Sequence, residues 1–250
     1  MRADLPRRDR SVLLGPIVTV ARTDSIGTTS TEVLREHLAS RHSCRAFRPD
    51  PVPRDVLETI FDLARRTPSW CNTQPWQAYV TEGEGTERFR LALLAQVAAD
   101  AMSPDFDFPV RYEGEFRERR RACAWQLYDA LGIEFRDRAA SVRQTARNFE
   151  LIGAPHVAII TTESALGTYG AVDTGPYVQT FLLAAESLGL GAIPQAALAG
   201  HAPFIKEHFG MPESRAVVCG ISFGWPDKPA PENGFRTERT SVAETLMWSS

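Results

Sequence analysis

The stretch AVDTGPYVQTFLLAAESLGLGAIPQAA, residues Ala171–Ala197, decides the fold class. Its apolar first part, as far as Leu188, predicts a long buried helix. Gly189-Leu190-Gly191 then ends the helix and leads directly into Ile193–Ala197. A Gly-x-Gly after a helix is typical of a helix C-cap, whereas the dinucleotide-binding glycines follow a strand. The sequence therefore excludes a Rossmann fold.

The other segments predict several helices and few strands. Strands are expected at Trp76–Thr81, at His156–Thr162, which is apolar enough to be buried on both faces, and at Arg215–Phe223. In the last of these, one face would carry Val217, Cys219, Ile221 and Phe223. Two helices are expected near the N-terminus: one from a Thr31 cap to Ser40, and one that begins at Pro53 and carries Val56, Ile60, Leu63 and Ala64 on one face. Two more are expected over Thr86–Ala99 and Pro203–Phe209. A last helix should follow the Ser241-x-x-Glu244 capping box. Without regular strand–helix alternation, this pattern predicts an α+β layer fold.

A single domain is expected over residues 30–250, because 250 residues with 43% hydrophobic content can bury one sizeable core. Residues 1–29 form a separate N-terminal extension in this prediction. Their apolar stretch Val12–Ala21 follows basic residues as in a signal peptide, but Pro16 interrupts it. No segment reaches the roughly 18 apolar residues that a membrane span needs. We therefore expect a disordered extension and no membrane association.

Charge and cysteine content exclude two further classes of function. The net charge of −3 and pI near 6.0 argue against a nucleic-acid partner, and acidic neighbours make the Arg117–Arg121 run a solvated helix face. The four cysteines form no Cys-x-x-Cys pair, so no metal site is expected. Scattered thiols suit a reducing compartment, and the predicted location is the cytoplasm.

Two arginine-rich segments and one loop carry the candidate chemistry. Arg41-His42-Ser43-Cys44-Arg45 offers forked donors and a hydroxyl, which suit a phosphate, and Arg236-Thr237-Glu238-Arg239 offers a second basic pair. Between them, the loop Pro68–Trp76 contains Asn72 and Gln74, whose amides suit a heterocycle or a polyol. Together they indicate an anionic, planar cofactor.

These three segments, in this order, resemble the FMN-dependent nitroreductase family over about residues 31–248. The resemblance implies a central, mostly antiparallel sheet surrounded by helices, in an intertwined homodimer with FMN at the subunit interface. It implies an NAD(P)H oxidoreductase that reduces nitroaromatic or related acceptors by ping-pong hydride transfer through flavin N5. NADH or NADPH would be the electron donor. No catalytic side chain is expected, because the flavin carries the chemistry.

The resemblance also implies the roles of individual residues. Arg41, Ser43 and Arg239 would hold the phosphate with help from Arg236, and Arg45 would approach the pyrimidine edge of the flavin. The backbone of Pro194-Gln195-Ala196-Ala197 would face N5. The whole expected cofactor set is Arg41, His42, Ser43, Arg45, Pro68, Ser69, Trp70, Asn72, Gln74, Pro194, Gln195, Ala196, Ala197, Arg236 and Arg239. For Gln74, an amide that only satisfies its own loop is an equal alternative.

Residues 101–150 are expected to form a helical insertion that covers the active site as a lid. An aromatic substrate would contact Trp70, Phe106, Tyr112, Trp125 and Tyr128, although the lid aromatics could equally serve only to attach its helices. Trp70 departs from the small residue usual at this position in the family, which leaves the substrate class open. Reductive dehalogenation, oxidation by dioxygen and a non-catalytic flavin-binding role are the alternatives.

Overall fold

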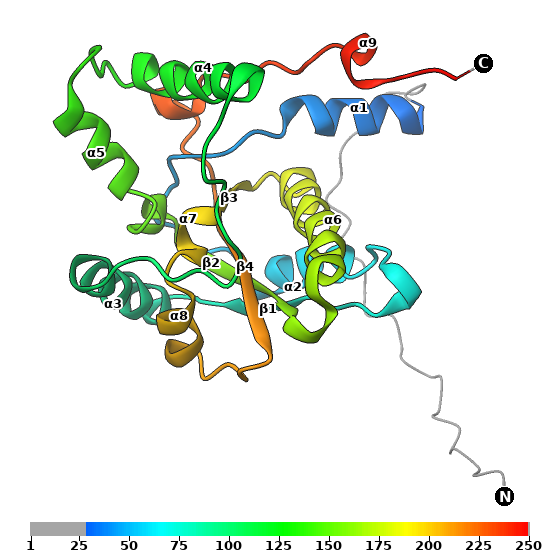
Figure 1. Ribbon diagram of the computed structural model, residues 1–250, viewed down its shortest axis with the longest axis vertical. Coiled ribbons are helices and arrows are strands. Elements are labelled where there is room, and N and C mark those ends of the chain that lie inside the picture. The colour runs from blue at the N-terminus through cyan, green and yellow to red at the C-terminus, as the bar shows by residue number, and fades with distance from the viewer. Residues whose placement is uncertain (1–28, 250) are drawn as a thin grey trace, which may run out of the picture.

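A four-stranded antiparallel sheet forms the centre of the computed structural model, which describes residues 29–249 (Figure 1). The predicted extension of residues 1–29 therefore lies, apart from Thr29, outside the described residues. The strands are ordered β1-β2-β4-β3. Their bounds are Gln77–Val80 for β1, His156–Glu163 for β2, Gly191–Gln195 for β3 and Arg215–Gly224 for β4. The α+β class expected from the sequence is confirmed.

Helices cover both faces of the sheet and divide the core into two clusters. On one face, α2 (Arg54–Ala64) and α6 (Gly167–Ser187) bury Ile60 and Phe181 against Phe223. The opposite face is covered by α3 (Glu84–Ala99), α7 (Ala196–Ala199) and α8 (Ala202–His208). Strand β2 is buried on both faces, as predicted, because Val157 and Ile159 enter one cluster and Ala158 and Ile160 the other.

A β-bulge corrects the prediction for β4. Ile160 pairs with Cys219 but Thr161 pairs with Val217, so Val218 is an extra residue without a partner on β2. An extra residue reverses the alternation of side chains. Cys219, Ile221 and Phe223 therefore share one face, as expected, while Val217 points into the other cluster.

Two helix predictions near the N-terminus were partly wrong. Helix α1 (Ser30–Ser40) is capped by Thr29 rather than Thr31, because the Thr29 hydroxyl and the Glu32 carboxylate form a complete capping box. In α2, Leu57 is buried in place of the expected Leu63, whose side chain lies outside the core cluster. Helix α6 begins four residues earlier than expected and ends as predicted, with Gly189 at φ +79°.

The remaining helices gather away from the sheet, at the end drawn uppermost in Figure 1. They are α4 (Gly114–Ala130), α1 and the single turn α9 (Val242–Thr245), which has the predicted capping box of Ser241 and Glu244, with α5 (Arg138–Ala146) beside them. None of these four helices contains a fully buried residue. Short 3₁₀ turns occupy Trp70–Asn72 (η1), Leu151–Gly153 (η2), Ser164–Leu166 (η3) and Pro231–Asn233 (η4). Among the helices within residues 29–249, none combines the length and the apolar character that crossing a bilayer requires.

Candidate functional site

The segment Arg41–Arg45 lies along β3. Ser43 forms a parallel bridge with Ala192, and the Cys44 N–H donates to the Ala192 carbonyl at 3.1 Å. This approach depends on Gly191, since a Cβ there would lie 2.5 Å from the Cys44 Sγ. The glycine that follows the central helix thus allows the first arginine segment to reach the sheet.

Asn233 joins this segment to the C-terminal part of the chain. Its Oδ1 accepts from the Arg45 N–H at 2.7 Å, and its Nδ2 donates to the carbonyls of Ala46 and Asp227 at 2.9 and 2.8 Å. Asn233 is buried, so these bonds are shielded from water. They place Arg236, three residues later, next to the Arg41 segment. Sequence reasoning missed Asn233, whose only local signal is its place in the turn Pro231–Gly234.

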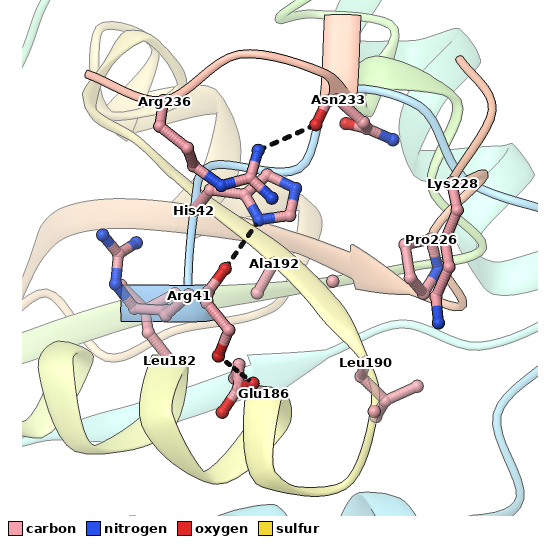
Figure 2. A pocket seen from close by; sticks show the side chains of 13 residues that line it. Arg41, His42, Leu182, Glu186, Leu190, Ala192, Pro226, Lys228, Asn233 and Arg236 are labelled. Atoms are coloured by element: carbon pink, nitrogen blue, oxygen red, sulfur yellow. Dashed lines mark hydrogen bonds between the residues drawn. The ribbon is translucent and has the colours of Figure 1, made fainter. Parts of the chain in front are cut away.

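Four arginines from these two segments line one pocket of about 270 Å³, together with Ser43. They are Arg41, Arg45, Arg236 and Arg239. A second cavity of about 370 Å³ adjoins it and shares Arg41, His42 and Arg236 with it (Figure 2). The structure therefore brings together all five residues expected at the phosphate end and the pyrimidine edge.

Three of these guanidinium groups bond to backbone or hydroxyl oxygens rather than to carboxylates. Nη1 of Arg45 donates to the Ser43 carbonyl at 2.9 Å, and Nη1 of Arg236 donates to the Asn233 carbonyl at 2.9 Å. In Arg239, Nη1 donates to the Thr237 hydroxyl at 2.8 Å. Within residues 29–249, none of the four pocket arginines forms an ion pair. The pocket thus holds four guanidinium groups with which no carboxylate of the described chain forms an ion pair.

The pKa shifts of Arg41 and Arg45 agree with this concentration of positive charge. Burial lowers the pKa of Arg41, and the charges of Arg239 and Arg236 lower it further. Burial also lowers the pKa of Arg45. The negative charge of Glu186 acts in the opposite direction on Arg41. Each shift is mainly the cost of holding a cationic form out of water, and an anion in the pocket would relieve that cost.

His42 provides an unused polar atom at the same place. One ring nitrogen, Nδ1, lies 3.0 Å from the Ser40 carbonyl and donates to it, while the buried Nε2 has no partner among the described residues. Burial lowers the pKa of His42, and the neighbouring Arg236, Arg41 and Arg45 lower it further. A buried atom without a partner is unfavourable, so Nε2 is suited to a bond with a bound molecule. The donor set fits a phosphate ester with further polar groups.

The loop Pro68–Trp76 lies elsewhere in the same chain. It contacts the N-terminal half of α6, where Trp70 meets Tyr169 and Asp173, whereas Ser40 and His37 contact Glu186 at the other end of this helix. Thirteen residues of helix separate Asp173 from Glu186, roughly 20 Å at 1.5 Å per residue. The structure therefore does not bring Pro68, Ser69, Trp70, Asn72 and Gln74 to the arginine pocket of their own chain.

Comparison with known proteins identifies the family. Residues 38–225 match the family model of the Nitroreductase family. The chain is 36% identical over 216 residues to nitroreductase NfnB of Mycolicibacterium smegmatis, which covers 85% of this chain and 91% of the relative. The chain belongs to the nitroreductase family. A 4-nitrobenzoate reductase of Pseudomonas putida is 35% identical over 81% of this chain and 89% of its own length.

Solved structures of the nitroreductase family share the fold. The FMN-dependent nitroreductase NfnB from Mycobacterium smegmatis, crystallised in complex with NADPH, superposes with a TM-score of 0.83 at 33% identity. The match covers 88% of this chain and 99% of that one. The nitroreductase-like fold expected from the arginine motifs is thereby confirmed.

In Pro194–Ala197, the segment expected to face the flavin, exposed and buried side chains alternate at the first three positions. Pro194 and Ala196 are exposed, while Gln195 between them is buried. The Gln195 amide donates to the Asn148 carbonyl at 3.1 Å and accepts from the Ser222 hydroxyl at 2.5 Å. The Gln195 side chain of this nitroreductase therefore fixes the end of β3 and is occupied by contacts within its own chain.

The expected lid helix α4 lies against the arginine pocket, but the structure does not bring together the five aromatic residues expected to contact a substrate. Cys123 of α4 lines the pocket, and the Gln126 amide donates to the Arg236 carbonyl at 3.4 Å. Trp125 packs edge-on against Tyr128 at 5.7 Å, and Tyr112 lies beneath Arg120. Phe106 follows Asp105, which binds Lys206 and the β4 backbone, and Trp70 of η1 packs against Tyr169 of α6. In one chain these aromatics occupy three separate places.

Proposed function

We propose that this nitroreductase-family protein is an FMN-dependent NAD(P)H oxidoreductase that reduces nitroaromatic compounds. Relatives that match over about nine tenths of their own length include enzymes named nitroreductase NfnB and 4-nitrobenzoate reductase. Each covers more than four fifths of this chain. The free cysteines within the described part of the chain suit a reducing compartment, and we place the enzyme in the cytoplasm.

The observation that carries the proposal is the arginine pocket. Four guanidinium groups and the Ser43 hydroxyl line a space whose lining contains no carboxylate of residues 29–249. Three of these guanidinium groups and the hydroxyl suit the terminal phosphate of FMN, because charge-assisted bonds are shorter and stronger than neutral ones. Arg41, Ser43 and Arg239 would bind this phosphate, and Arg236 would assist them.

Arg45 would act at the other end of the cofactor. Its guanidinium is held by the Ser43 carbonyl and by the ring of Phe235, 5.4 Å from its Cζ. A fixed cation stabilises negative charge that develops at the pyrimidine edge of the flavin during reduction. When bound, FMN supplies the redox chemistry, accepting hydride from NADH or NADPH at N5 and passing two electrons to the nitro group. The chain itself binds, orients and shields the cofactor.

We further propose a homodimer with two composite sites. The loop of Ser69, Asn72 and Gln74 lies too far from the arginines of its own chain, so a second copy would supply it. Large apolar side chains remain exposed on the elements that surround the loop and the C-terminal end. They are Val33, Leu34 and Leu38 on α1, Tyr169 and Val172 on α6, and Leu246, Met247 and Trp248 after α9. Burial of such surfaces in a second copy would stabilise the dimer.

Absorbance spectroscopy tests the function directly. The purified protein would show the flavin bands, lose them on anaerobic addition of NADPH or NADH, and regain them when a nitroarene such as nitrobenzoate is added. A colourless protein that cannot be reconstituted with FMN would refute the cofactor assignment. Bound flavin that neither nicotinamide reduces would refute the enzymatic role and leave a flavin-binding protein.

A further inference from the structure

Three residues spaced four apart on α6, Tyr169, Asp173 and Tyr177, hold the loop Pro68–Trp76. Residues at this spacing share one face of a helix. Trp70 packs edge-on against Tyr169 with ring centroids 4.7 Å apart, and Trp76 stacks on Tyr177 at 4.9 Å. The two aromatic contacts attach both halves of the loop to the same helix face.

Asp173 makes the polar contact at the centre of this face. Both of its carboxylate oxygens accept from the Trp70 N–H, at 3.2 and 3.1 Å. Trp70 begins the turn η1, whose N-cap residue Ser69 supplies no side-chain bond to it. A carboxylate at the N-terminus of a helical turn satisfies a free N–H and interacts favourably with the peptide dipoles. Asp173 therefore caps η1 from another element.

The loop needs such support because its backbone is strained. Cys71, Asn72 and Gln74 have φ values of +53°, +55° and +48°, in the left-handed region that side chains disfavour. Such conformations persist when the surroundings over-determine them. Here the Ser69 hydroxyl accepts from the Gln74 N–H at 2.9 Å, and Arg215 donates to the Pro75 carbonyl at 2.8 Å.

Asp173 itself has no other bonded partner within residues 29–249. Among residues 29–249, no ion pair includes Asp173, and its carboxylate accepts hydrogen bonds only from the Trp70 N–H. By contrast, the exposed Asp62 on α2 pairs with Arg65. Within the described part of the chain, the Asp173 carboxylate thus bonds only to the loop.

We propose that Asp173 is a positioning residue for the cofactor, which holds Ser69 and Asn72 in their binding conformation before FMN arrives. The inference rests on the proposed function, since it requires that the loop contacts flavin. When only a fraction of molecules has the competent conformation, the apparent dissociation constant rises by the inverse of that fraction. Loss of the carboxylate would therefore weaken FMN binding without removing any group that touches FMN.

Asp173→Ala and Asp173→Asn test this, with Asp62→Ala as the matched control. We expect Asp173→Ala to raise the FMN dissociation constant about tenfold and to alter the visible circular dichroism of bound flavin. Asp173→Asn keeps one acceptor oxygen, so its FMN dissociation constant should rise about threefold, to a value between those of the wild type and Asp173→Ala. Asp62→Ala should leave both measurements at the wild-type value. Thermal unfolding of each apoprotein separates these effects from general destabilisation.

An Asp173→Ala protein with the wild-type dissociation constant and dichroism would overturn the inference, whatever its melting temperature. If this variant does not fold, Asp173→Asn decides alone, and unchanged flavin binding and dichroism in it would have the same meaning. A wild-type protein that binds no FMN would overturn the proposed function as well. Flavin binding by the wild type with no response in either variant would overturn only the role of Asp173.

Discussion

The side-chain oxygen of Asn233 accepts a hydrogen bond from the backbone N–H of Arg45 at 2.7 Å, across 188 positions of the chain. The same amide donates to the Ala46 and Asp227 carbonyls. This one buried residue thus connects the two arginine segments that form the pocket.

Replacing Asn233 should therefore loosen both the fold and the pocket. Asn233→Ala removes three hydrogen bonds and leaves their half-buried partners unsatisfied, so the free energy of unfolding should fall by about 2–3 kcal/mol. At this chain length the melting temperature should fall by about 5–10 °C. Asn233→Asp keeps the acceptor for Arg45 and should show a smaller loss of FMN affinity than Asn233→Ala. Equal FMN affinity in the alanine variant and the wild type would contradict the connecting role.

Arg239→Ala should weaken FMN binding, because it removes a charge-assisted bond to the phosphate. Such bonds contribute about 1.5–3 kcal/mol, which corresponds to roughly a tenfold or larger increase in the dissociation constant. Flavin fluorescence titration measures this increase. Arg88→Ala is the control, since Arg88 pairs with Glu84 on the exposed side of α3. Unchanged flavin content of Arg239→Ala after gel filtration would refute the assignment.

Arg45→Ala should make bound flavin harder to reduce, because a cation near the pyrimidine edge favours the reduced, more negative form. The midpoint potential should become more negative, by roughly 30 mV for each 1.4 kcal/mol of lost stabilisation in a two-electron couple. Arg45→Lys retains the charge, so its midpoint potential should lie closer to the wild-type value than that of Arg45→Ala. Identical potentials in Arg45→Ala and the wild type would remove Arg45 from the redox role.

Mixed dimers can show whether each site uses two chains. If the arginines come from one subunit and the loop from its partner, Arg239→Ala and Asn72→Ala homodimers should both bind FMN weakly. A mixed dimer of these variants would contain one site with both wild-type groups, and one doubly altered site. We therefore expect unfolding and refolding of the two variants together to restore tight FMN sites. No restoration in verified mixed dimers would place both groups in one chain.

Acid should destabilise the protein through His156, which is only 1% exposed. Its Nε2 accepts from the Val52 N–H at 3.0 Å and its Nδ1 donates to the Thr81 carbonyl at 3.1 Å, which defines a neutral ring. Burial lowers the pKa of His156 below 6.5 in the folded state. As the pH falls below about 6.5, His156 binds a proton in the unfolded chain but not yet in the folded chain, so protonation favours unfolding.

This protonation should lower the free energy of unfolding by at most about 1.4 kcal/mol per pH unit, from about pH 6.5 down to the folded-state pKa. Above this range His156 should contribute no pH dependence. Urea unfolding between pH 8 and pH 5 measures the slope. His156→Gln retains a hydrogen-bonding side chain without the titration, so its slope should be shallower than that of the wild type. Parallel slopes would show that other groups cause the loss.

Much of the fold could be predicted because the relevant signals are local. The apolar run Val157–Ile160 indicated a strand buried on both faces, and Gly189 indicated the end of α6, since each depends on the periodicity or backbone freedom of its own segment. The arginine motifs likewise indicated the family, because the cofactor's chemistry selects those residue types at fixed spacing. Val217 was assigned to the wrong face because a bulge depends on pairing with another strand.

The site itself depends on contacts between distant segments. Asn233 reaches Arg45 only after the sheet has brought both ends of the chain together, and Asp173 reaches Trp70 only because α6 packs beside the loop. Neither contact has a local pattern. Sequence alone therefore determined most of the elements and the family, but it did not predict strand β3. Only the tertiary structure decided that the arginines form one pocket while Asn72 and Gln74 lie at the other end of α6, because long-range packing sets those distances.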